Sequence, residues 1–346
     1  MALILPLGCA APPRPQHAYV WQRTWDDAVR AGVAQAAPVF DGLRVNAASV
    51  GQDGERLHAV DPSALGDEPV IAVVRIEATV APDPARTGAL LDHLAREWRG
   101  AGVALTGVEI DHDCPTRALP QYAAALSRIR GALDPSVALS ITALPTWATA
   151  PTEAAAVAAS VDAVVLQVHT VDRGVLFDRA RAEAAVRAWA PLTDRPLWVA
   201  VPAYGMAVGG RPTRVDPVEL AGFVRALDRR IAGVVWFRLP VPGDRSTWSL
   251  PAIRAAIRGE VPRGAVRVSV SPGPAGAFDV ALVGEGDVWA PAPPRIAFEG
   301  GCTAGDALPG WSFSPGGFTR IDPLPIDPGA TVAVGWLRCE RAPEVR

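Results

Sequence analysis

The stretch that decides the fold is "TGVEIDHD", residues 106–113, in which Glu109, Asp111 and Asp113 stand at alternate positions. Successive side chains of a β-strand point to opposite faces, so these three carboxyl groups share one face, about 6.6 Å apart per step. On the solvated face of an antiparallel sheet such a row is harmless, whereas inside a closed barrel it is unfavourable unless the acids are used. The rest of the sequence has to show which environment is built.

Eight short β-rich apolar runs recur along the first two thirds of the chain, and most are separated by Ala/Leu/Arg-rich segments with helical spacing. Strands that alternate with helices indicate parallel βαβ units, and eight units match a closed (β/α)8 TIM barrel in number and length. An open doubly wound sheet is the alternative, but it usually carries a Gly-rich phosphate-binding turn after its first strand, and "YVWQRTWDD" contains no glycine. The eight runs span residues 17–23, 43–50, 69–78, 107–113, 137–147, 161–170, 196–205 and 233–240.

The chain changes character after the predicted barrel domain, residues 17–260. Valines alternate there with polar residues, Pro and Gly mark turns, and no helical spacing remains. This pattern predicts a small antiparallel β-sandwich over residues 261–346, in which Cys302 and Cys339 can form a disulfide if the protein is exported. The sandwich is either a carbohydrate-binding module or a structural brace, and its tryptophans permit the former: Trp289, Trp311 and Trp336.

Residues 1–16, "MALILPLGCAAPPRPQ", resemble the end of a bacterial lipoprotein signal followed by a Pro-rich tether, with Cys9 as the lipidated residue. The positive n-region is absent and the apolar run is short, and a true start codon further upstream would account for both departures. A merely apolar N-terminus is the alternative. No other run approaches the roughly 18–20 apolar residues of a membrane span. We therefore expect an exported cell-envelope lipoprotein, periplasmic or on the outer membrane, that contacts the membrane only through its lipid.

The composition excludes several classes of protein. With 49% hydrophobic residues among 346 and a net charge of −3, the chain can bury a large core and has no charge field that suggests nucleic acid. No CxxC or Cys/His cluster predicts a metal site, and no phosphate-cradling loop predicts a nucleotide. Cys114 is left as a free thiol beside the acid row. We expect no metal, no cofactor and a monomer.

At this point a resemblance to a known family becomes specific. "TGVEIDHD" resembles the strand-four motif DGxDxDxE of the family 18, chitinase-like glycoside hydrolases, with Glu109 and Asp111 on the two inner acids and Asp113 on the catalytic Glu. "VPAYG" (201–205) is similar to their strand-seven segment and "VVLQVHT" (164–170) to their strand-six segment. The ordered set "IDHDC", "LSITALPTW", "LQVH" and "VPAYG" also resembles an uncharacterised bacterial family, domain of unknown function 3142.

Glycoside hydrolysis needs one protonated carboxyl group, and burial among like charges can keep a carboxyl group protonated. The resemblance implies that Asp113 protonates the glycosidic oxygen. It also implies that Asp111 orients an N-acetyl group of the substrate, which attacks in place of an enzyme nucleophile, and that Glu109 supports Asp111. An Asp in place of the Glu withdraws the proton donor by about 1 Å, and such a displacement can lower the rate ~10²-fold.

Further residues at the predicted strand ends are candidates for saccharide contact. Aromatic rings pack against the C–H faces of sugars, although rings also cap barrel cores. Trp21 is a weaker candidate of this kind, and Arg23 with Arg238 could instead neutralise the acid row as ion pairs. Glu77 could be a second catalytic carboxyl, whereas His112 alternates to the outer face. The predicted substrate-binding residues are Tyr204, Trp236, His169, Gln167, Trp147, Glu77 and Arg238.

Three hypotheses of function follow. The first is a glycoside-hydrolase-like envelope lipoprotein that hydrolyses or processes a polysaccharide, such as one containing N-acetylhexosamine, by acid catalysis from the strand-four carboxylates. The second is a non-catalytic glycan-binding lipoprotein on a degenerate glycosidase barrel, and both take a polysaccharide or oligosaccharide as partner. The third, a metal-dependent hydrolase using Asp111, His112 and Asp113, is disfavoured because alternation points His112 away from the aspartates.

Overall fold

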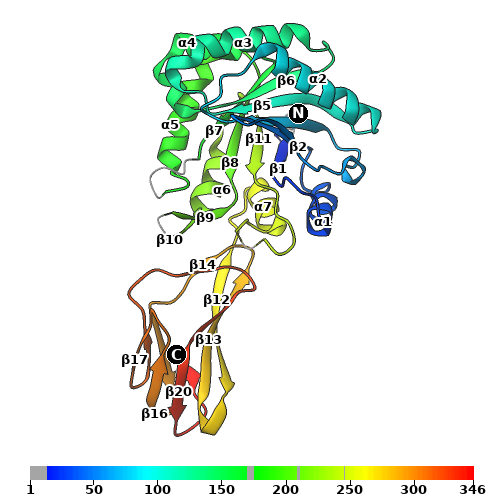
Figure 1. The fold of residues 1–346 in the computed structure, drawn as a ribbon. Coiled ribbons are helices and arrows are strands. Elements are labelled where there is room, and N and C mark those ends of the chain that lie inside the picture. Colours follow the sequence, from blue (N-terminus) through cyan, green and yellow to red (C-terminus); the bar gives the residue numbers. More distant parts are fainter. Residues whose placement is uncertain (1–13, 170–174, 209–210, 245) are drawn as a thin grey trace, which may run out of the picture. The chain divides into compact units, whose positions relative to one another are not determined.

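The computed structural model describes residues 14–169, 175–208, 211–244 and 246–346 (Figure 1). The chain forms two compact units. The first consists of the residues up to Val168 together with Glu183–Val201 and Leu227–Leu239, and the second of His169–Ala182, Pro202–Ala226 and Pro240–Arg346. The second unit includes segments of the predicted 17–260 domain, so the compact units and the predicted domains are divided differently. Cys9 lies outside the described residues.

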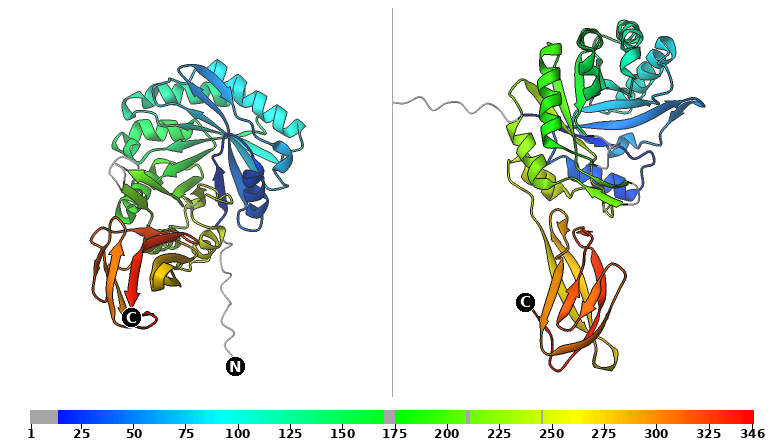
Figure 2. Two further views of the ribbon diagram at one scale, coloured as in Figure 1. Left: turned by 60° about the horizontal axis from the view of Figure 1, so that its bottom comes forward. Right: turned by 90° about the vertical axis from the view of Figure 1, so that its left-hand side faces the viewer.

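Eight parallel strands close into a barrel, which confirms the predicted TIM-barrel fold (Figures 1 and 2). The ring runs in the order β1-β11-β8-β7-β6-β5-β4-β2, and β2 pairs in turn with β1 to close it. Because every strand has two neighbours, no edge of the ring is left open. The strands are β1 (Gln16–Val20), β2 (Gly42–Gly51), β4 (Val70–Ile76), β5 (Leu105–His112), β6 (Ala138–Ala143), β7 (Ala163–Gln167), β8 (Leu197–Pro202) and β11 (Ile231–Phe237).

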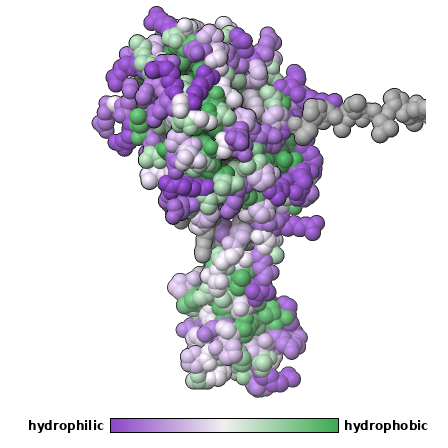
Figure 3. Space-filling view, turned by 90° about the vertical axis from the view of Figure 1, so that its right-hand side faces the viewer, coloured by the Kyte–Doolittle hydropathy of each residue, from purple (hydrophilic) through white to green (hydrophobic). Residues whose placement is uncertain are grey.

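Helices alternate with most of these strands, and their starts follow from local sequence. Asp26 and Asp83 cap helices α1 and α2 by accepting hydrogen bonds from backbone N–H groups of the first turn, and Pro84 stands at the first helical position. On the side drawn in Figure 3, hydrophilic residues cover much of the surface and hydrophobic residues are scattered among them. No described helix is long and apolar enough to cross a membrane. The helices are α1 (Asp27–Ala36), α2 (Pro84–Gly100), α3 (Leu119–Ala132), α4 (Pro151–Ala159), α5 (Arg179–Trp189), α6 (Pro217–Ala226) and α7 (Leu250–Ile257).

The connection between β2 and β4 contains no α-helix. Instead β3 (Gly54–Leu57) returns antiparallel along the end of β2, and a short 3-10 helix, η1 (Pro62–Ala64), follows. The hairpin extends β2 at the carboxyl end of the barrel strands, which is the end where TIM-barrel active sites lie. Further 3-10 turns are η2 (Thr116–Ala118), η3 (Pro145–Thr149), η4 (Ala190–Leu192) and η5 (Pro274–Gly276).

The C-terminal part of the second unit is built from antiparallel sheets, as the alternating valines predict (Figure 2). Two four-stranded sheets contribute to one apolar cluster that includes Val280, Leu282, Phe318 and Leu337. The first sheet has the order β12 (Gly264–Pro272), β13 (Phe278–Gly286), β20 (Thr331–Cys339), β16 (Cys302–Ala307); the second has β17 (Ser312–Ser314), β18 (Gly317–Thr319), β15 (Arg295–Glu299), β21 (Glu344–Val345). Two short pairs are β14 (Ala290–Pro291) with β19 (Pro325–Ile326), and β9 (Gly205–Val208) with β10 (Arg211–Arg214).

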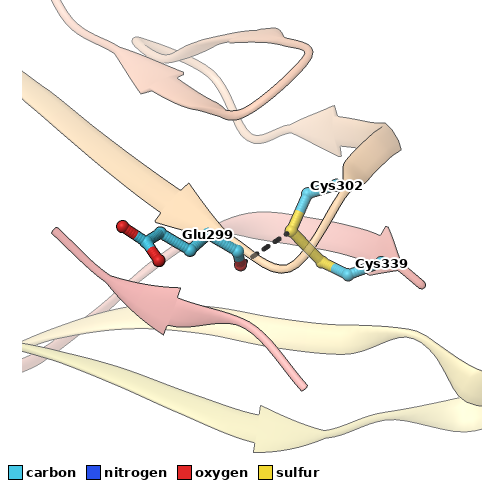
Figure 4. Close-up of a disulfide and its surroundings, with 3 residues drawn as sticks. All are labelled: Glu299, Cys302 and Cys339. Carbon is cyan, nitrogen blue, oxygen red and sulfur yellow. Dashed lines mark hydrogen bonds between the residues drawn. A yellow bond between two sulfur atoms is a disulfide. The ribbon is translucent and has the colours of Figure 1, made fainter. Parts of the chain in front are cut away.

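A disulfide joins Cys302 to Cys339, which are partners in the β16–β20 ladder (Figure 4). The carbonyl oxygen of Glu299 lies 3.7 Å from the sulfur of Cys302. The bond closes a loop with a sequence separation of 37 residues. Because a cross-link of this kind restricts the unfolded chain, it stabilises the small β-unit beyond what its apolar cluster supplies.

Replacing both Cys302 and Cys339 with Ser should lower the free energy of unfolding of the C-terminal sheets by about 4 kcal/mol, the chain-entropy value for a loop of this length. Urea unfolding followed by circular dichroism measures this loss, with Cys114→Ala as the control for removing a thiol that forms no disulfide. A double variant as stable as the parent chain would show that the cross-link is dispensable.

Candidate functional site

The strand β5 carries the row of acids on its inner face. Its residues Val108, Ile110 and His112 are almost fully buried and alternate with Glu109 and Asp111. Glu109 is the ladder partner of Val73, which belongs to the apolar cluster inside the barrel. Since ladder partners on parallel strands face the same way, the acids point into the barrel. Asp113 follows directly after the strand end, at the carboxyl-terminal mouth.

Glu109 is held inside the barrel by three donors. Its side chain is fully buried, and Oε1 accepts a hydrogen bond from Tyr19 Oη at 2.6 Å. Its Oε2 accepts from the Arg44 guanidinium and from Ser140 Oγ, the latter at 3.0 Å. Burial, and next the Glu109 charge, raise the pKa of Tyr19, so this phenol remains a hydrogen-bond donor. With both oxygens engaged, Glu109 supports the layer above it and does not present a carboxyl group to a ligand.

Asp111 is also saturated by protein donors. It is 2% exposed, Thr142 Oγ1 donates to its Oδ1 at 2.7 Å, and Arg75 Nη1 donates to its Oδ2 at 2.7 Å. Burial raises the pKa of Asp111, while the charge of Arg75 and the Thr142 hydrogen bond oppose this rise. Asp111 therefore depends on Arg75 to remain ionised in a buried position.

Arg75 bridges the two aspartates. Its Nη2 donates to Asp113 Oδ2 at 2.5 Å while its Nη1 holds Asp111. Burial lowers the pKa of Arg75. The charges of Asp111 and Asp113 and their hydrogen bonds together raise this pKa by more than burial lowers it, so the net shift is upward. The side chain of Asp113 is 34% exposed, and it is the exposed member of the acid row. The acid row thus presents one carboxylate at the mouth, and this carboxylate is already paired with a guanidinium.

The two arginines that neutralise the acid row were not found from sequence. Arg23 and Arg238 were predicted as the ion-pair partners, whereas the described ion pairs of Glu109, Asp111 and Asp113 come from Arg44 and Arg75. A signal was present in "LRVNAASV" and "VIAVVRI", in each of which an Arg is the single charged residue. A charge that enters a barrel interior requires a counter-charge there, and the acid row is that counter-charge.

Aromatic rings lie on the inner face of β1 and β11. Trp21 and Phe237, both half-buried, contact each other edge-to-face with centroids 5.2 Å apart. Tyr19 contacts both rings, at 5.6 Å and 5.7 Å. Since Tyr19 also donates to Glu109, these rings adjoin the acid row inside the same unit. They provide an apolar surface of the kind that a sugar face can contact.

Trp236 does not lie at the mouth, contrary to the prediction. Val235 faces the barrel interior, so alternation turns Trp236 outward and brings Phe237 inward. Trp236 is fully buried, and its indole nitrogen donates to Gln16 Oε1 at 2.9 Å. The resemblance had placed the strand-eight aromatic one residue away from the ring that faces inward.

Trp147 is also absent from the mouth. Strand β6 ends at Ala143, and Trp147 falls in the 3-10 turn η3, fully buried, where its indole nitrogen donates to the Cys114 carbonyl at 2.8 Å. Its ring packs against Tyr122 of α3 and Trp189 of α5. It is therefore a core residue between barrel and helices.

The remaining residues predicted to bind substrate lie at strand ends of the first unit or in the second unit. Gln167 ends β7, half-buried, two residues after the inward-facing Val165. Glu77 is exposed just beyond β4, with its carboxylate against Gly51, and Arg238 is half-buried just beyond β11. His169 and Tyr204 belong to the second unit, where their rings meet edge-to-face at 6.0 Å. Thr170, the last residue of the segment "VVLQVHT" that resembles strand six of the family, lies outside the described residues.

A serine–histidine pair beside Arg75 was missed by the sequence analysis. Ser49 is the ladder partner of Arg75, and its Oγ lies 2.9 Å from Nε2 of His58, which follows β3. The other ring nitrogen of His58 lies 3.0 Å from the Asn46 carbonyl oxygen. The pKa of His58 is lowered, mainly by burial and to a smaller degree by the charges of Arg23 and Arg56. The hydrogen bond with the Asn46 carbonyl opposes this shift. The neutral His58 ring thus connects the segment after β3 to Ser49 and Asn46 of β2.

Metal or thiol chemistry has no support in this site. Among the residues that the structure describes, no three His, Cys, Asp or Glu side chains group as metal ligands. His112 faces away from the aspartates, with Nδ1 3.3 Å from the Ile76 carbonyl oxygen and its ring against Tyr122. Cys114 is buried, which raises the pKa of its thiol to about 11, so it is not a thiolate at neutral pH.

Comparison with solved structures shows that the barrel shares its fold with several proteins of low sequence identity. A chitinase from Chromobacterium violaceum ATCC 12472 superposes with a TM-score of 0.53 at 12% identity over 71% of this chain and 98% of that one. A chitinase from Bacteroides thetaiotaomicron gives 0.52 at 12% identity (71% and 97%), and the Bacillus cereus spore cortex-lytic enzyme SleL gives 0.52 at 11% (71% and 74%). At these identities the likeness shows a shared fold.

Family models match two segments of the chain. Residues 66–219 match the domain of unknown function DUF3142, which confirms the resemblance seen in the strand motifs, and residues 268–340 match the domain of unknown function DUF8456. A search of curated protein sequences gives no match.

Replacing Glu109 with Gln should strongly destabilise the barrel, because it leaves the Arg44 charge buried without a counter-charge. Removing one partner of a buried ion pair typically costs about 3–5 kcal/mol. Urea unfolding measures the change. Asp92→Asn, which breaks an exposed pair with Arg96 on α2, is the matched control and should change stability by less than about 1 kcal/mol. Similar losses in the two variants would contradict the structural role of Glu109.

His17 lies on the inner face of β1 below the acids. It is 8% exposed, and its ring packs against Trp198 with centroids 4.5 Å apart. Arg44 stacks over the same indole at 5.1 Å. Burial, followed by the Arg44 charge, lowers the pKa of His17 to about 3 from its ordinary value of 6.5. The folded protein therefore holds His17 neutral where the unfolded chain would protonate it.

This shift predicts acid lability. The stability that neutral His17 contributes is complete above pH 6.5 and falls by about 1.4 kcal/mol per pH unit as the pH drops towards 3. In His17→Gln, the slope of unfolding free energy against pH between 6 and 4 should be smaller than in the parent chain by about this amount. Chemical unfolding at a series of pH values measures both slopes, and equal slopes would refute the assignment.

Proposed function

We propose that the protein binds a polysaccharide chain at the carboxyl-terminal mouth of its barrel without efficient hydrolysis. The observation that carries this proposal is Arg75, which pairs with Asp111 and Asp113 together. The glycoside-hydrolase-like fold supports a carbohydrate ligand, and the local chemistry of the acid row argues against its use as a proton donor.

A general acid has to carry a proton to the leaving oxygen. A carboxylate oxygen that accepts a charge-assisted hydrogen bond from a guanidinium is occupied by that donor, and the pair has to break before the oxygen can deliver a proton. Asp113 accepts such a bond from Arg75 at 2.5 Å. Its side chain is also one methylene shorter than the Glu of the family motif. Both features make Asp113 a hydrogen-bond acceptor for sugar hydroxyl groups and a poor acid.

Other groups of the barrel interior and mouth suit a saccharide. Trp21 and Phe237 supply half-buried ring surface, and the exposed Asp113 supplies carboxylate oxygen. Two of the compared structures are chitinases, and chitin is a polymer of N-acetylglucosamine. We therefore propose that the ligand is a chain containing N-acetylhexosamine.

Hydrolysis with Asp113 as the acid is the second candidate. It is favoured by the position of Asp113, which ends the acid row at the mouth and is partly exposed, while Arg75 is itself 27% exposed and so within reach of a ligand. A substrate that drew Arg75 away from Asp113 would release the carboxyl group for proton transfer. The two candidates differ in whether Asp113 is needed for product or only for binding.

Export to the cell envelope is part of the proposal. The Cys302–Cys339 disulfide supports an oxidising compartment, since such bonds rarely persist in the cytosol. Lipidation at Cys9 would then hold the protein at a membrane surface, where a polysaccharide ligand is accessible.

Binding and turnover can be separated with chitohexaose and glycol chitin as probes. Isothermal titration with the parent chain should show binding that weakens about tenfold or more in Trp21→Ala/Phe237→Ala, because the apolar contact is lost. The parent chain should release no more reducing ends than the Asp113→Asn variant does. Asp92→Asn on α2, an arginine-paired aspartate outside the barrel, serves as the control for Asp113→Asn.

Two outcomes would change the conclusion. Reducing ends released by the parent chain and by Asp92→Asn, but not by Asp113→Asn, would establish hydrolysis as the function. Absence of binding to both probes would refute the proposed N-acetylhexosamine ligand.

A further inference from the structure

The sheet β12-β13-β20-β16 carries an exposed tryptophan between two aspartates. Trp336 of β20 is 38% exposed. Its ladder partner on β13 is Asp279, and its ladder partner on β16 is Asp306. Ser271 of β12 is in turn the partner of Asp279. Directly opposed residues on neighbouring strands lie about 4.5–5.5 Å apart at Cα, so these four side chains form one row across the sheet.

Alternation places this row on the outer face of the sheet. Leu337 and Val280, the next residues along β20 and β13, are buried in the apolar cluster. The four members of the row, Ser271, Asp279, Trp336 and Asp306, are all exposed. The indole is therefore not part of the core of this unit.

Three alanines and one arginine border the indole along the strands. In one direction the next outward pair is Ala281 with Ala333, and in the other Ala304 lies beside Arg338. The alanines are too short to cover the indole, while the exposed Arg338 lies on the same face two residues along β20. The result is a partly exposed indole between two carboxylates, bordered by alanines and by one arginine.

The structure distinguishes Trp336 from the other tryptophans that the sequence left as candidates. Trp311 is 8% exposed, and Arg320 stacks on it at 5.5 Å. Trp289 is half-buried, and its indole nitrogen donates to the Val215 carbonyl at 3.0 Å. Of these three, Trp336 alone presents its ring to solvent on an open sheet face.

We infer that this face is a second saccharide site, which binds a chain of neutral pyranose rings. The C–H face of a pyranose packs on an indole, and carboxylates on both sides accept hydrogen bonds from its equatorial hydroxyl groups. Asp279 and Asp306 stand one strand spacing from Trp336 on either side, which is the reach of hydroxyl groups at the edges of a stacked ring. Two carboxylates beside the ring disfavour sugars that carry acidic groups.

A protein partner fits this face less well. Protein interfaces are depleted in aspartate at their centres, and here the aspartates flank the only large apolar side chain of the row. The site belongs to the segment that matches DUF8456, and it depends on no residue of the barrel mouth. The inference is therefore independent of the function proposed for the barrel.

Native affinity electrophoresis of the full chain tests the inference, with glycol chitin, hydroxyethyl cellulose and xylan as neutral probes and polygalacturonate as the anionic probe. At least one neutral polymer should retard the parent chain, and polygalacturonate should not. Trp336→Ala should weaken that retardation about tenfold, and Trp336→Phe should recover part of it, because a smaller ring still stacks. Asp279→Asn/Asp306→Asn should weaken it as well.

Controls separate this site from the barrel and from unfolding. Leu308→Ala removes another exposed apolar side chain of the same unit and should leave retardation unchanged. Trp21→Ala/Phe237→Ala changes the barrel mouth, and the retardation that depends on Trp336 should persist in it. Thermal unfolding should show Trp336→Ala to be as stable as the parent chain. Retardation equal in Trp336→Ala and the parent, or no retardation by any neutral polymer, would overturn the inference.

Discussion

The barrel interior depends on matching buried carboxylates with arginines from neighbouring strands. Glu109 and Asp111 are removed from water, and a buried charge without a partner is strongly unfavourable. Arg44 on β2 compensates Glu109, and Arg75 on β4 compensates Asp111. Such pairs are weak evidence for extra stability, but breaking one leaves an uncompensated charge. The acids and arginines therefore persist only as a set, and the closed ring of strands holds that set together.

The same charge balance determines what the mouth can do. Arg75 not only compensates Asp111 but also reaches Asp113, the residue that the sequence resemblance aligns with the catalytic Glu of the family 18 motif. A carboxylate oxygen held by a guanidinium in this way has to leave that pair before it can take part in proton transfer. The rings of Trp21 and Phe237 keep an apolar surface on the neighbouring part of the inner face.

The antiparallel sheets of the C-terminal part, residues 264–346, are stabilised differently from the barrel. These sheets are open, and each has one face toward solvent. One face supplies the apolar cluster around Leu282 and Phe318, and the Cys302–Cys339 bond ties β16 to β20. The opposite face is free to carry function, and Trp336 lies on it between two aspartates. A small unit that buries only one side of its main sheet can expose an aromatic ring without weakening its core.

The sequence by itself determined the closed parallel barrel and the inward direction of Glu109, Asp111 and Asp113, because the period of side chains along a strand is a local property. Tertiary structure decided which partners these acids meet. Arg44 and Arg75 reach them through the register between strands distant in sequence, which no local pattern encodes. Strand β11 turns Trp236 outward and Phe237 inward, and the strand end at Ala143 leaves Trp147 in the buried turn that follows. The direction in which an acid of β5 points thus follows from the alternation along its own strand. The residues that it contacts on other strands are decided only when the strands pair and the barrel closes.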